Sequence, residues 1–270
     1  KTENFSYGVS VNVGNGNFSS GRQRALSIQN GLDEAILNYK ARLHSKSSSP
    51  TLSIEPRLTW VLDNADTVTM RNRIYYQKVS GQELTDWSVM SGYAPNANGN
   101  IVNEKMNDDR KGLNTELNWE RKFADEFGGE STLQANFGFT YFNLNSVGFD
   151  YAGNSGVQLI SSRNTRNNES QQDWNTRGSF NTSLTKTHVV KIGWDAGVTL
   201  LDNHKIQIRN QLGIQEPDLN NINHVKINRA ALYVQDEWQA TPTWSHYFGM
   251  RWEMFQTQGS GNNFSQFKNN

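Results

Sequence analysis

The sequence predicts an all-β protein, the antiparallel up-and-down wall of a transmembrane β-barrel. Three observations predict this fold class. Apolar and polar residues alternate with a period of two through most of the 270 residues, which is typical of strands with one apolar face. The alternating runs are about ten residues long, the length with which a tilted strand crosses a bilayer. The connections between the runs sort into short and long ones, as the two rims of a membrane barrel do.

The composition fits a protein that needs only one apolar face for each strand. Only 35% of the residues are hydrophobic although 11% are aromatic, whereas a disordered chain would be poor in aromatic residues. The 26 basic and 26 acidic residues cancel, which gives no support for a nucleic-acid partner. No apolar run approaches the ~20 residues of a membrane helix, so any spanning elements must be strands.

Each predicted strand rests on one alternating run. The clearest runs are "FSYGVSVNV" (5–13) and "LSIEPRLTWVL" (52–62), in which an apolar residue stands at nearly every second position. Their lengths exceed the ~5–6 residues typical of soluble sheets. About eleven strands are expected on this pattern. In chain order they lie at residues 5–13, 23–30, 35–43, 52–62, 68–76, 113–123, 133–141, 174–184, 190–200, 231–240 and 244–254.

The connections carry independent information. From the second strand on, short turns are expected at residues 30–31, 63–66, 124–130, 185–187 and 241–243. A moderate connection is expected at 45–50, and long loops at 80–111, 145–171 and 201–225. Transmembrane barrels have short turns on the periplasmic rim and long loops on the outer rim.

Pairing across two hairpins tests whether the faces are continuous, because opposed residues must point to one side of a sheet. We expect Leu62 opposite Val68, which sets Arg57 opposite Arg73. Around Pro242 we expect three pairs, which match apolar with apolar and polar with polar: Val234–Met250, Leu232–Trp252 and Tyr233–Arg251. Asp236 alone falls on the apolar side, so it requires either a place near the rim or a bulge.

The polar side of several neighbouring strands carries charges that would face the barrel lumen. The candidates for lumen-facing or plug-facing residues are Arg57, Arg71, Arg73, Glu116, Glu120, Tyr233 and Arg251, with Lys40 and Arg42 on an earlier strand. Two interpretations remain open. The side chains form a self-contained ladder of cross-strand ion pairs, or some of the arginines contact a plug or an anionic ligand through paired hydrogen bonds.

The predicted long loops are rich in Asn, Gly and aromatic residues. They could build a ligand-binding surface above the barrel mouth, for which the candidates are Trp87, Tyr93, Phe149 and Tyr151. They could equally be solvated loops that only shield the mouth.

Nothing in the sequence indicates catalysis or a cofactor. The chain has no cysteine, and its five histidines lack the spacing of a zinc site. The glycine-containing segments do not continue into Gly-Lys-Ser/Thr, and no nucleophile motif occurs. We therefore expect no enzyme activity, no metal site and no cofactor.

Two segments resemble TonB-dependent outer-membrane receptors. The first is "LSIEPRLTWVLDNADTVTM" (52–70), with Pro56, Arg57, Leu58 and Trp60 at the matching positions. The second is "AALYVQDEWQATPTWSHYFGMRWE" (230–253), in which the matching residues are Tyr233, Gln235, Asp236, Trp238, Gly249, Arg251 and Trp252.

The resemblance implies a 22-stranded barrel in the outer membrane of a Gram-negative bacterium, filled by an N-terminal plug and energised by the TonB complex. It implies import of a scarce nutrient, which in this family is typically a ferric siderophore, haem, cobalamin or an oligosaccharide, and we expect a ferric siderophore or a similar iron chelate. On this view residues 1–270 are part of the barrel domain, without the plug and the C-terminal strands. The partners would be the TonB complex, the lipid bilayer and the small-molecule ligand. The alternatives are a smaller porin-like diffusion channel and a soluble β-protein that binds glycans.

Overall fold

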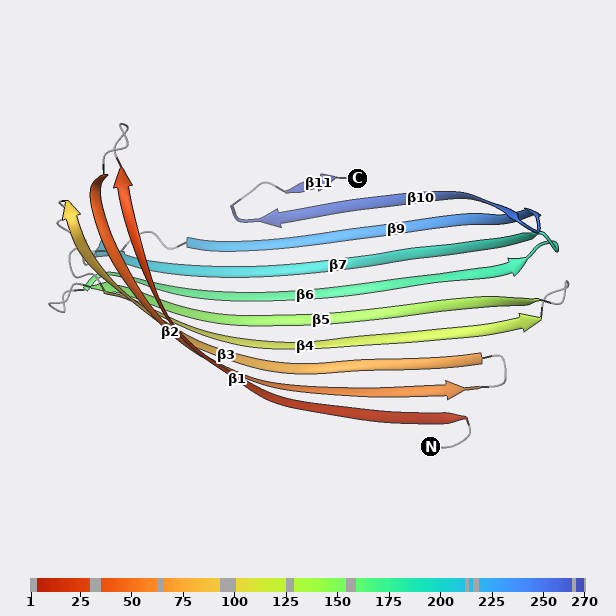
Figure 1. Cartoon of the computed structure of the whole chain (residues 1–270), viewed down its shortest axis with the longest axis horizontal. Coiled ribbons are helices and arrows are strands. Elements are labelled where there is room, and N and C mark those ends of the chain that lie inside the picture. The colour runs from red at the N-terminus through yellow and green to blue at the C-terminus, as the bar shows by residue number, and fades with distance from the viewer. Residues whose placement is uncertain are drawn as a thin grey trace.

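The computed structural model describes residues 4–29, 35–62, 66–92, 101–124, 129–153, 159–211, 214–215, 219–263 and 266–269. These residues form one antiparallel sheet of eleven strands in the order β1-β2-β3-β4-β5-β6-β7-β9-β10-β11, with β8 paired to β7. Consecutive long strands lie side by side (Figure 1). β1 stands at one edge and β10 with β11 at the other, so the sheet is open within the described residues. The fold class predicted from the sequence is confirmed.

The strands are longer than the sequence predicts. Their bounds are β1 Phe5–Gln29, β2 Ala35–Val61, β3 Asp66–Gly92, β4 Ile101–Ala124, β5 Glu130–Gly153, β6 Leu159–Ser183, β7 His188–Gln211, β8 Ile214–Gln215, β9 Leu219–Thr241, β10 Trp244–Gly261 and β11 Phe267–Asn269. Toward one end of the sheet, β1, β2 and β3 turn away from the other strands (Figure 1).

The predicted boundaries within the first two strands are wrong. The run 5–13 and residues 23–29 of the second run fall within one strand, β1, whose pairing with β2 is continuous from Phe5 to Ile28. The runs 35–43 and 52–62 likewise fall within β2, so residues 45–50 are strand and not a connection. The total of eleven is reached instead with the short strands β8 and β11. Ladder hydrogen bonds join backbone groups, so a serine-rich stretch can continue a strand whose partner is in place.

The predicted long loops are mostly strand as well. β3 continues to Gly92, and β4 begins at Ile101. The same holds at 145–171, where β5 ends at Gly153 and β6 begins at Leu159, and at 201–225, where β7 ends at Gln211. These hairpins therefore carry the sheet well beyond the apolar part of each strand.

One predicted register is confirmed and one is wrong. Around Pro242, Val234 lies opposite Met250 and Tyr233 opposite Arg251, as expected. In the β2–β3 hairpin, however, Trp60 lies opposite Val68 and Arg57 opposite Arg71. The backbone N–H of Leu62 donates to the carbonyl oxygen of Asp66 at 2.9 Å. The observed register is therefore shifted by two residues from the predicted one. A shift of two leaves every side chain on its predicted face.

The two faces of the sheet differ in composition, and the described residues contain almost no apolar core. Their buried hydrophobic residues are Ala41 and Ala231. Large apolar side chains are instead exposed on one face, including Val9, Trp60, Ile74, Leu232 and Met250, the last with 74% of its surface accessible. An exposed apolar face of this extent is a surface that contacts other apolar material. In a sheet of long antiparallel strands, that material is lipid.

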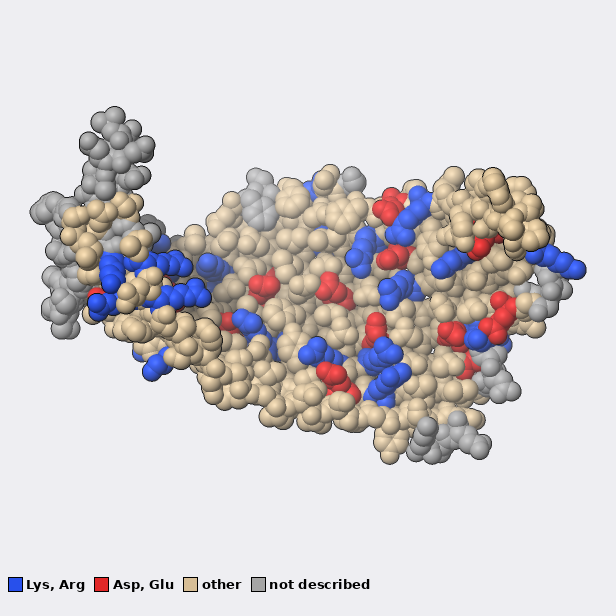
Figure 2. Space-filling view, in the orientation of Figure 1, with Lys and Arg blue, Asp and Glu red and all other residues tan. Residues whose placement is uncertain are grey.

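The charged residues have a different distribution. Acidic and basic side chains mix over the middle of the face seen in Figure 2, whereas Lys and Arg predominate at the end where β1 and β2 rise. We call the side that carries Arg57 and Arg251 the polar face and the side that carries Leu232 and Met250 the apolar face. The described residues contain no helix with the length and apolarity of a membrane span.

The separation of faces predicts an asymmetric response to charge. Leu232→Arg, on the apolar face of β9, is expected to lower the free energy of unfolding in lipid vesicles by about 2–4 kcal/mol, because the charge would lie in hydrocarbon. Gln235→Arg, on the polar face of the same strand, should change it by less than about 1 kcal/mol. Urea titration of the protein folded into vesicles measures both values, and equal losses would contradict the assignment of faces.

Candidate functional site on the polar face

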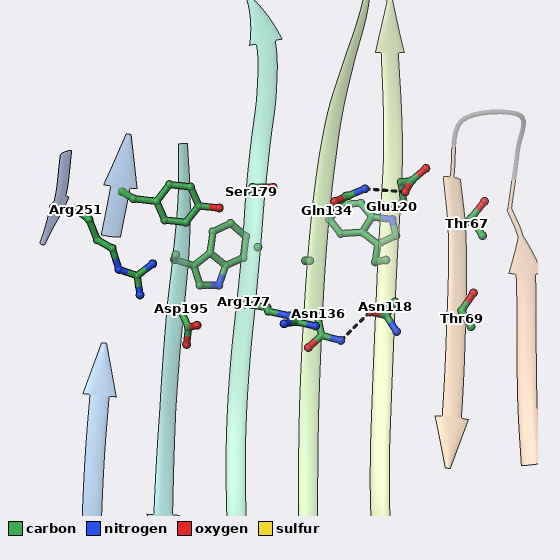
Figure 3. A pocket seen from close by; sticks show the side chains of 15 residues that line it. Thr67, Thr69, Asn118, Glu120, Gln134, Asn136, Arg177, Ser179, Asp195 and Arg251 are labelled. Atoms are coloured by element: carbon green, nitrogen blue, oxygen red, sulfur yellow. Dashed lines mark hydrogen bonds between the residues drawn. The ribbon is translucent and has the colours of Figure 1, made fainter. Parts of the chain in front are cut away.

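The polar face holds a groove of about 660 Å³ across β3–β10. The groove lies behind the apolar band, by which we mean the part of the apolar face that carries the large exposed apolar side chains such as Trp60, Leu232 and Met250. Figure 3 shows the side chains that line it, from Thr67 on β3 to Arg251 on β10. The polar-face side chains that line the groove are Thr67, Thr69, Asn118, Glu120, Gln134, Asn136, Arg177, Ser179, Asp195, Tyr233 and Arg251. Strand alternation brings them together, because residues two apart share a face and directly opposed residues face the same side.

Two cross-strand rows form the floor of the groove. In one, the Nδ2 of Asn136 donates to the Oδ1 of Asn118 at 2.7 Å, and Arg177 and Asp195 continue the row on β6 and β7. In the other, the Nε2 of Gln134 donates to the Oε2 of Glu120 at 2.9 Å. Both bonds are dashed in Figure 3. These amides fix the acceptor side chains in place while leaving part of each group available to an occupant of the groove.

Tyr233 and Arg251 close one end of the groove, as expected from their predicted pairing. The ring of Tyr233 lies over Gly193 on the neighbouring strand, and a Cβ atom at that glycine would overlap the ring. The guanidinium of Arg251 lies 6.0 Å from the centroid of the same ring, and Arg251 also pairs with Glu253. A glycine at position 193 is therefore what allows the tyrosine to lie flat along the polar face.

The remaining predicted lumen residues lie on the polar face beside the groove. Arg57 is opposite Arg71, and Arg71 is opposite Glu116. Of the predicted set, Arg73 forms an ion pair with Glu55, at 3.2 Å. Within the described residues, the side chains of Arg57, Arg71 and Glu116 form no hydrogen bond or ion pair. A self-contained ion-pair ladder therefore accounts for Arg73 but not for its neighbours.

A second hollow, of about 450 Å³, lies on the polar face farther from the short turns. Glu83, Glu104 and Asp150 lie there in one cross-strand row, and Arg163 pairs with Asp150. Partial burial raises the pKa of Glu104, and the carboxylates of Asp150 and Glu83 raise it further. This hollow lies beyond the apolar band, toward the ends of the strands that are farther from the short turns.

The structure does not bring the predicted loop residues together. Trp87 lies in β3 on the polar face, opposite Ala41. Phe149 and Tyr151 lie in β5 on the other face, with ring centroids 6.1 Å apart. Tyr93 lies outside the described residues.

The predicted face of Lys40 and Arg42 is wrong. Both were expected on the lumen side, but β2 is continuous from Ala35 to Val61, so its even positions share the face of Leu52 and Trp60. Lys40 and Arg42 therefore project from the opposite face to Arg57.

Sequence reasoning missed part of the groove. Gln134, Asn136, Arg177, Ser179 and Asp195 alternate with apolar residues on β5–β7, so their face was predictable. Their approach to Glu120 and Tyr233 depends on the register of four neighbouring hairpins, which no local pattern encodes.

Among the residues that the structure describes, no three His, Cys, Asp or Glu side chains are arranged to hold a metal ion. What the chain presents is a long antiparallel sheet with an apolar outer side and a grooved polar inner side, the wall of an outer-membrane type of barrel.

Residues 56–270 match the family model described as TonB dependent receptor-like, beta-barrel. The chain belongs to this family, whose members are transporters of the outer membrane. No curated protein matches the chain.

The contact between Gly193 and Tyr233 predicts a coupled pair. Gly193→Ala is expected to lower the free energy of unfolding by about 1–3 kcal/mol, because the methyl group would displace the ring. In the Tyr233→Ala background the same change should cost less, because only the overlap with the backbone carbonyl oxygen of Gly178 remains, and a double-mutant cycle measures the difference. Gly8→Ala is the matched control, since a Cβ atom there meets nothing within 4 Å. Equal costs in both backgrounds would show that the ring is not the obstacle.

Proposed function

We propose that the chain forms part of the barrel domain of an outer-membrane receptor that imports a scarce nutrient by active transport. The cargo proposed is a ferric siderophore or a similar iron chelate, and the energy comes through the TonB complex. The observation that carries the proposal is the polar face: in a chain of a transporter family, it holds a groove bordered by charges that have no partner among the described residues. In this proposal a plug domain, supplied by another part of the receptor, fills the barrel.

Unpaired charges on the polar face support a plug as occupant. Arg57 and Arg71 repel each other directly across a hairpin, and like charges in opposed positions destabilise a sheet. Carboxylates on a plug would relieve that repulsion, since arginine binds a carboxylate through two parallel hydrogen bonds. Glu116 and Asp195 on nearby strands would accept from basic groups of the same plug. The polar face thus offers charges of both signs to a folded polar surface.

The second hollow supports ligand entry from the outer side. Trp87 lies on the same face in the outer part of β3, and an aromatic ring suits the stacking of a planar chelating group. The basic residue Arg163 and the acidic residues beside it could select between ligands by charge.

Energy-dependent uptake tests the proposed function. Cells in which the full-length receptor is the sole uptake route would be given radioactive iron as trihydroxamate or tricatecholate complexes. We expect accumulation of at least one complex, abolished by deletion of TonB or by collapse of the proton gradient. Uptake that persists without TonB would identify a diffusion channel instead. Absence of uptake together with absence of TonB binding would reject the import function.

The opposed arginines Arg57 and Arg71 predict a transport defect that does not come from a loss of stability. The double variant Arg57→Gln/Arg71→Gln should reduce the rate of uptake at least about tenfold, because charged hydrogen bonds to the plug are lost. The control is Lys111→Gln/Lys226→Gln, which removes two positive charges from the apolar face. Similar rates in both double variants would show that the arginines do not contact the plug.

A further inference from the structure

A groove also lies on the outward side of the sheet, above the apolar band of β2, β3 and β4. It has a volume of about 440 Å³ and is lined by Lys46, Ser48, Ser80, Gln82, Lys105 and Asn107. All six occupy the face of Leu52 and Tyr76, because each strand is continuous and the register between them is regular here. The groove thus belongs to the side of the wall that contacts the membrane and not to the side that contacts cargo.

Two lysines in this groove have no counter-charge. Lys46 and Lys105 flank Gln82 in one cross-strand row, which continues through Phe149 without an acidic residue. Both lysines are exposed, and neither has a hydrogen bond or ion pair within the described residues. Elsewhere on this face Arg42 lies opposite Asp86 and Lys78 opposite Asp109, whereas Lys40 and Lys226 face uncharged residues as single charges. Lys46 and Lys105 differ from these in sharing one row.

The other groups that line the groove can bind an anion. Ser80 contributes a hydroxyl group and Asn107 an amide. The Oγ of Ser48 donates to the Oδ1 of Asn15 at 3.3 Å, and the Nε2 of Gln82 donates to the Oδ1 of Asn103 at 3.2 Å, which leaves Gln82 a second N–H. Hydroxyl and amide donors between two ammonium groups are what a phosphate needs, since it has several acceptor oxygens and a negative charge. A carboxylate could occupy the same place, but it would leave part of this donor set unused.

The height of the groove indicates which molecule carries the phosphate. On β2 the nearest residue of the apolar band is Leu52, which lies four residues after Ser48 and six after Lys46. At ~3.3 Å per residue and a tilt of ~45°, those positions lie roughly 9 and 14 Å above the edge of the hydrocarbon. A phospholipid headgroup layer is only about 5–8 Å thick on each side of the bilayer. A headgroup that reaches the groove must therefore be taller, as a saccharide is.

We propose that this outward groove binds a phosphate of a phosphorylated glycolipid in the outer leaflet. Lys46 and Lys105 neutralise the phosphate from either side, and the hydroxyl and amide groups orient it. Phe149 lies directly opposite Lys105, and its ring is 6.1 Å from that of Tyr151. These two rings offer the adjoining sugar a stacking surface on the same face. The lipid would anchor this part of the wall, where β2 and β3 turn away from the rest of the sheet together with β1 (Figure 1).

Native mass spectrometry of the full-length receptor in detergent tests the proposal. The probes are lipid A, lipid A stripped of phosphate, phosphatidylglycerol and inorganic phosphate. We expect lipid A to remain bound, and removal of its phosphates to weaken binding at least about tenfold. Lys46→Gln/Lys105→Gln should weaken lipid A binding about thirtyfold. Lys186→Gln/Lys226→Gln removes the same charge from a turn and from β9, and should leave the affinity unchanged.

Two results would overturn the proposal. The first is equal lipid A binding by the wild type and Lys46→Gln/Lys105→Gln, with both retaining β-sheet circular dichroism. The second is displacement of lipid A by millimolar inorganic phosphate or by phosphatidylglycerol, which would make the groove a general anion site. Because the readout is lipid retention and not uptake, either result leaves the import function standing.

Discussion

Every feature of this sheet depends on the need to satisfy backbone hydrogen bonds without help from water. In hydrocarbon, an unpaired N–H or C=O costs several kcal/mol, so only a continuous ladder can line a bilayer. The ladder here is nearly uninterrupted: β4 and β5 pair residue by residue from Ile101 to Ala124. Even the prolines of β2 are accommodated, since pairing with β3 lapses beside Pro50 and Pro56 and resumes in the same register. Regular pairing, more than side-chain packing, defines the fold.

Once the backbone is satisfied in this way, the side chains are free to sort by face. A core is unnecessary, and the described residues bury two hydrophobic side chains, both alanines. Close packing appears instead along the faces, where a large ring lies over a glycine of the adjacent strand. Tyr233 lies over Gly193 on the polar face, and Trp194 lies over Gly178 on the apolar face. In this sheet, glycines without a Cβ atom allow rings to pack closely on the neighbouring strand, whereas a globular core reaches close packing by interlocking its side chains.

The sequence predicts the structure well only where one face of a strand contacts lipid and must therefore be apolar. Within the apolar band, alternation identified each strand and its faces, and it assigned Glu120, Tyr233 and Arg251 to the polar face, but it did not predict the groove. Beyond the apolar band both faces contact water, so apolar and polar residues no longer alternate. Stretches such as 45–50 and 80–92 were therefore predicted as connections, although they are strand. Lys40 and Arg42 were misplaced for this reason. The β2–β3 register was missed by two residues because either alignment keeps the faces matched.

Asp236 shows that a residue can contradict the pattern and still fit the fold. It stays on the apolar face, directly opposite Phe248, with no bulge beside it. Its Oδ2 lies 2.9 Å from the Nδ1 of His188, and the His188 ring stacks on Trp238 at 5.8 Å. Asp236 and Trp238 share a face because they are two residues apart, so together they hold a histidine at the end of a short turn. A carboxylate is tolerable there because the strand is leaving the hydrocarbon and a partner is at hand. Asp236 and Trp238 thus act together at the rim by holding His188, which gives a structural reason for both residues to belong to the segment that resembles TonB-dependent receptors.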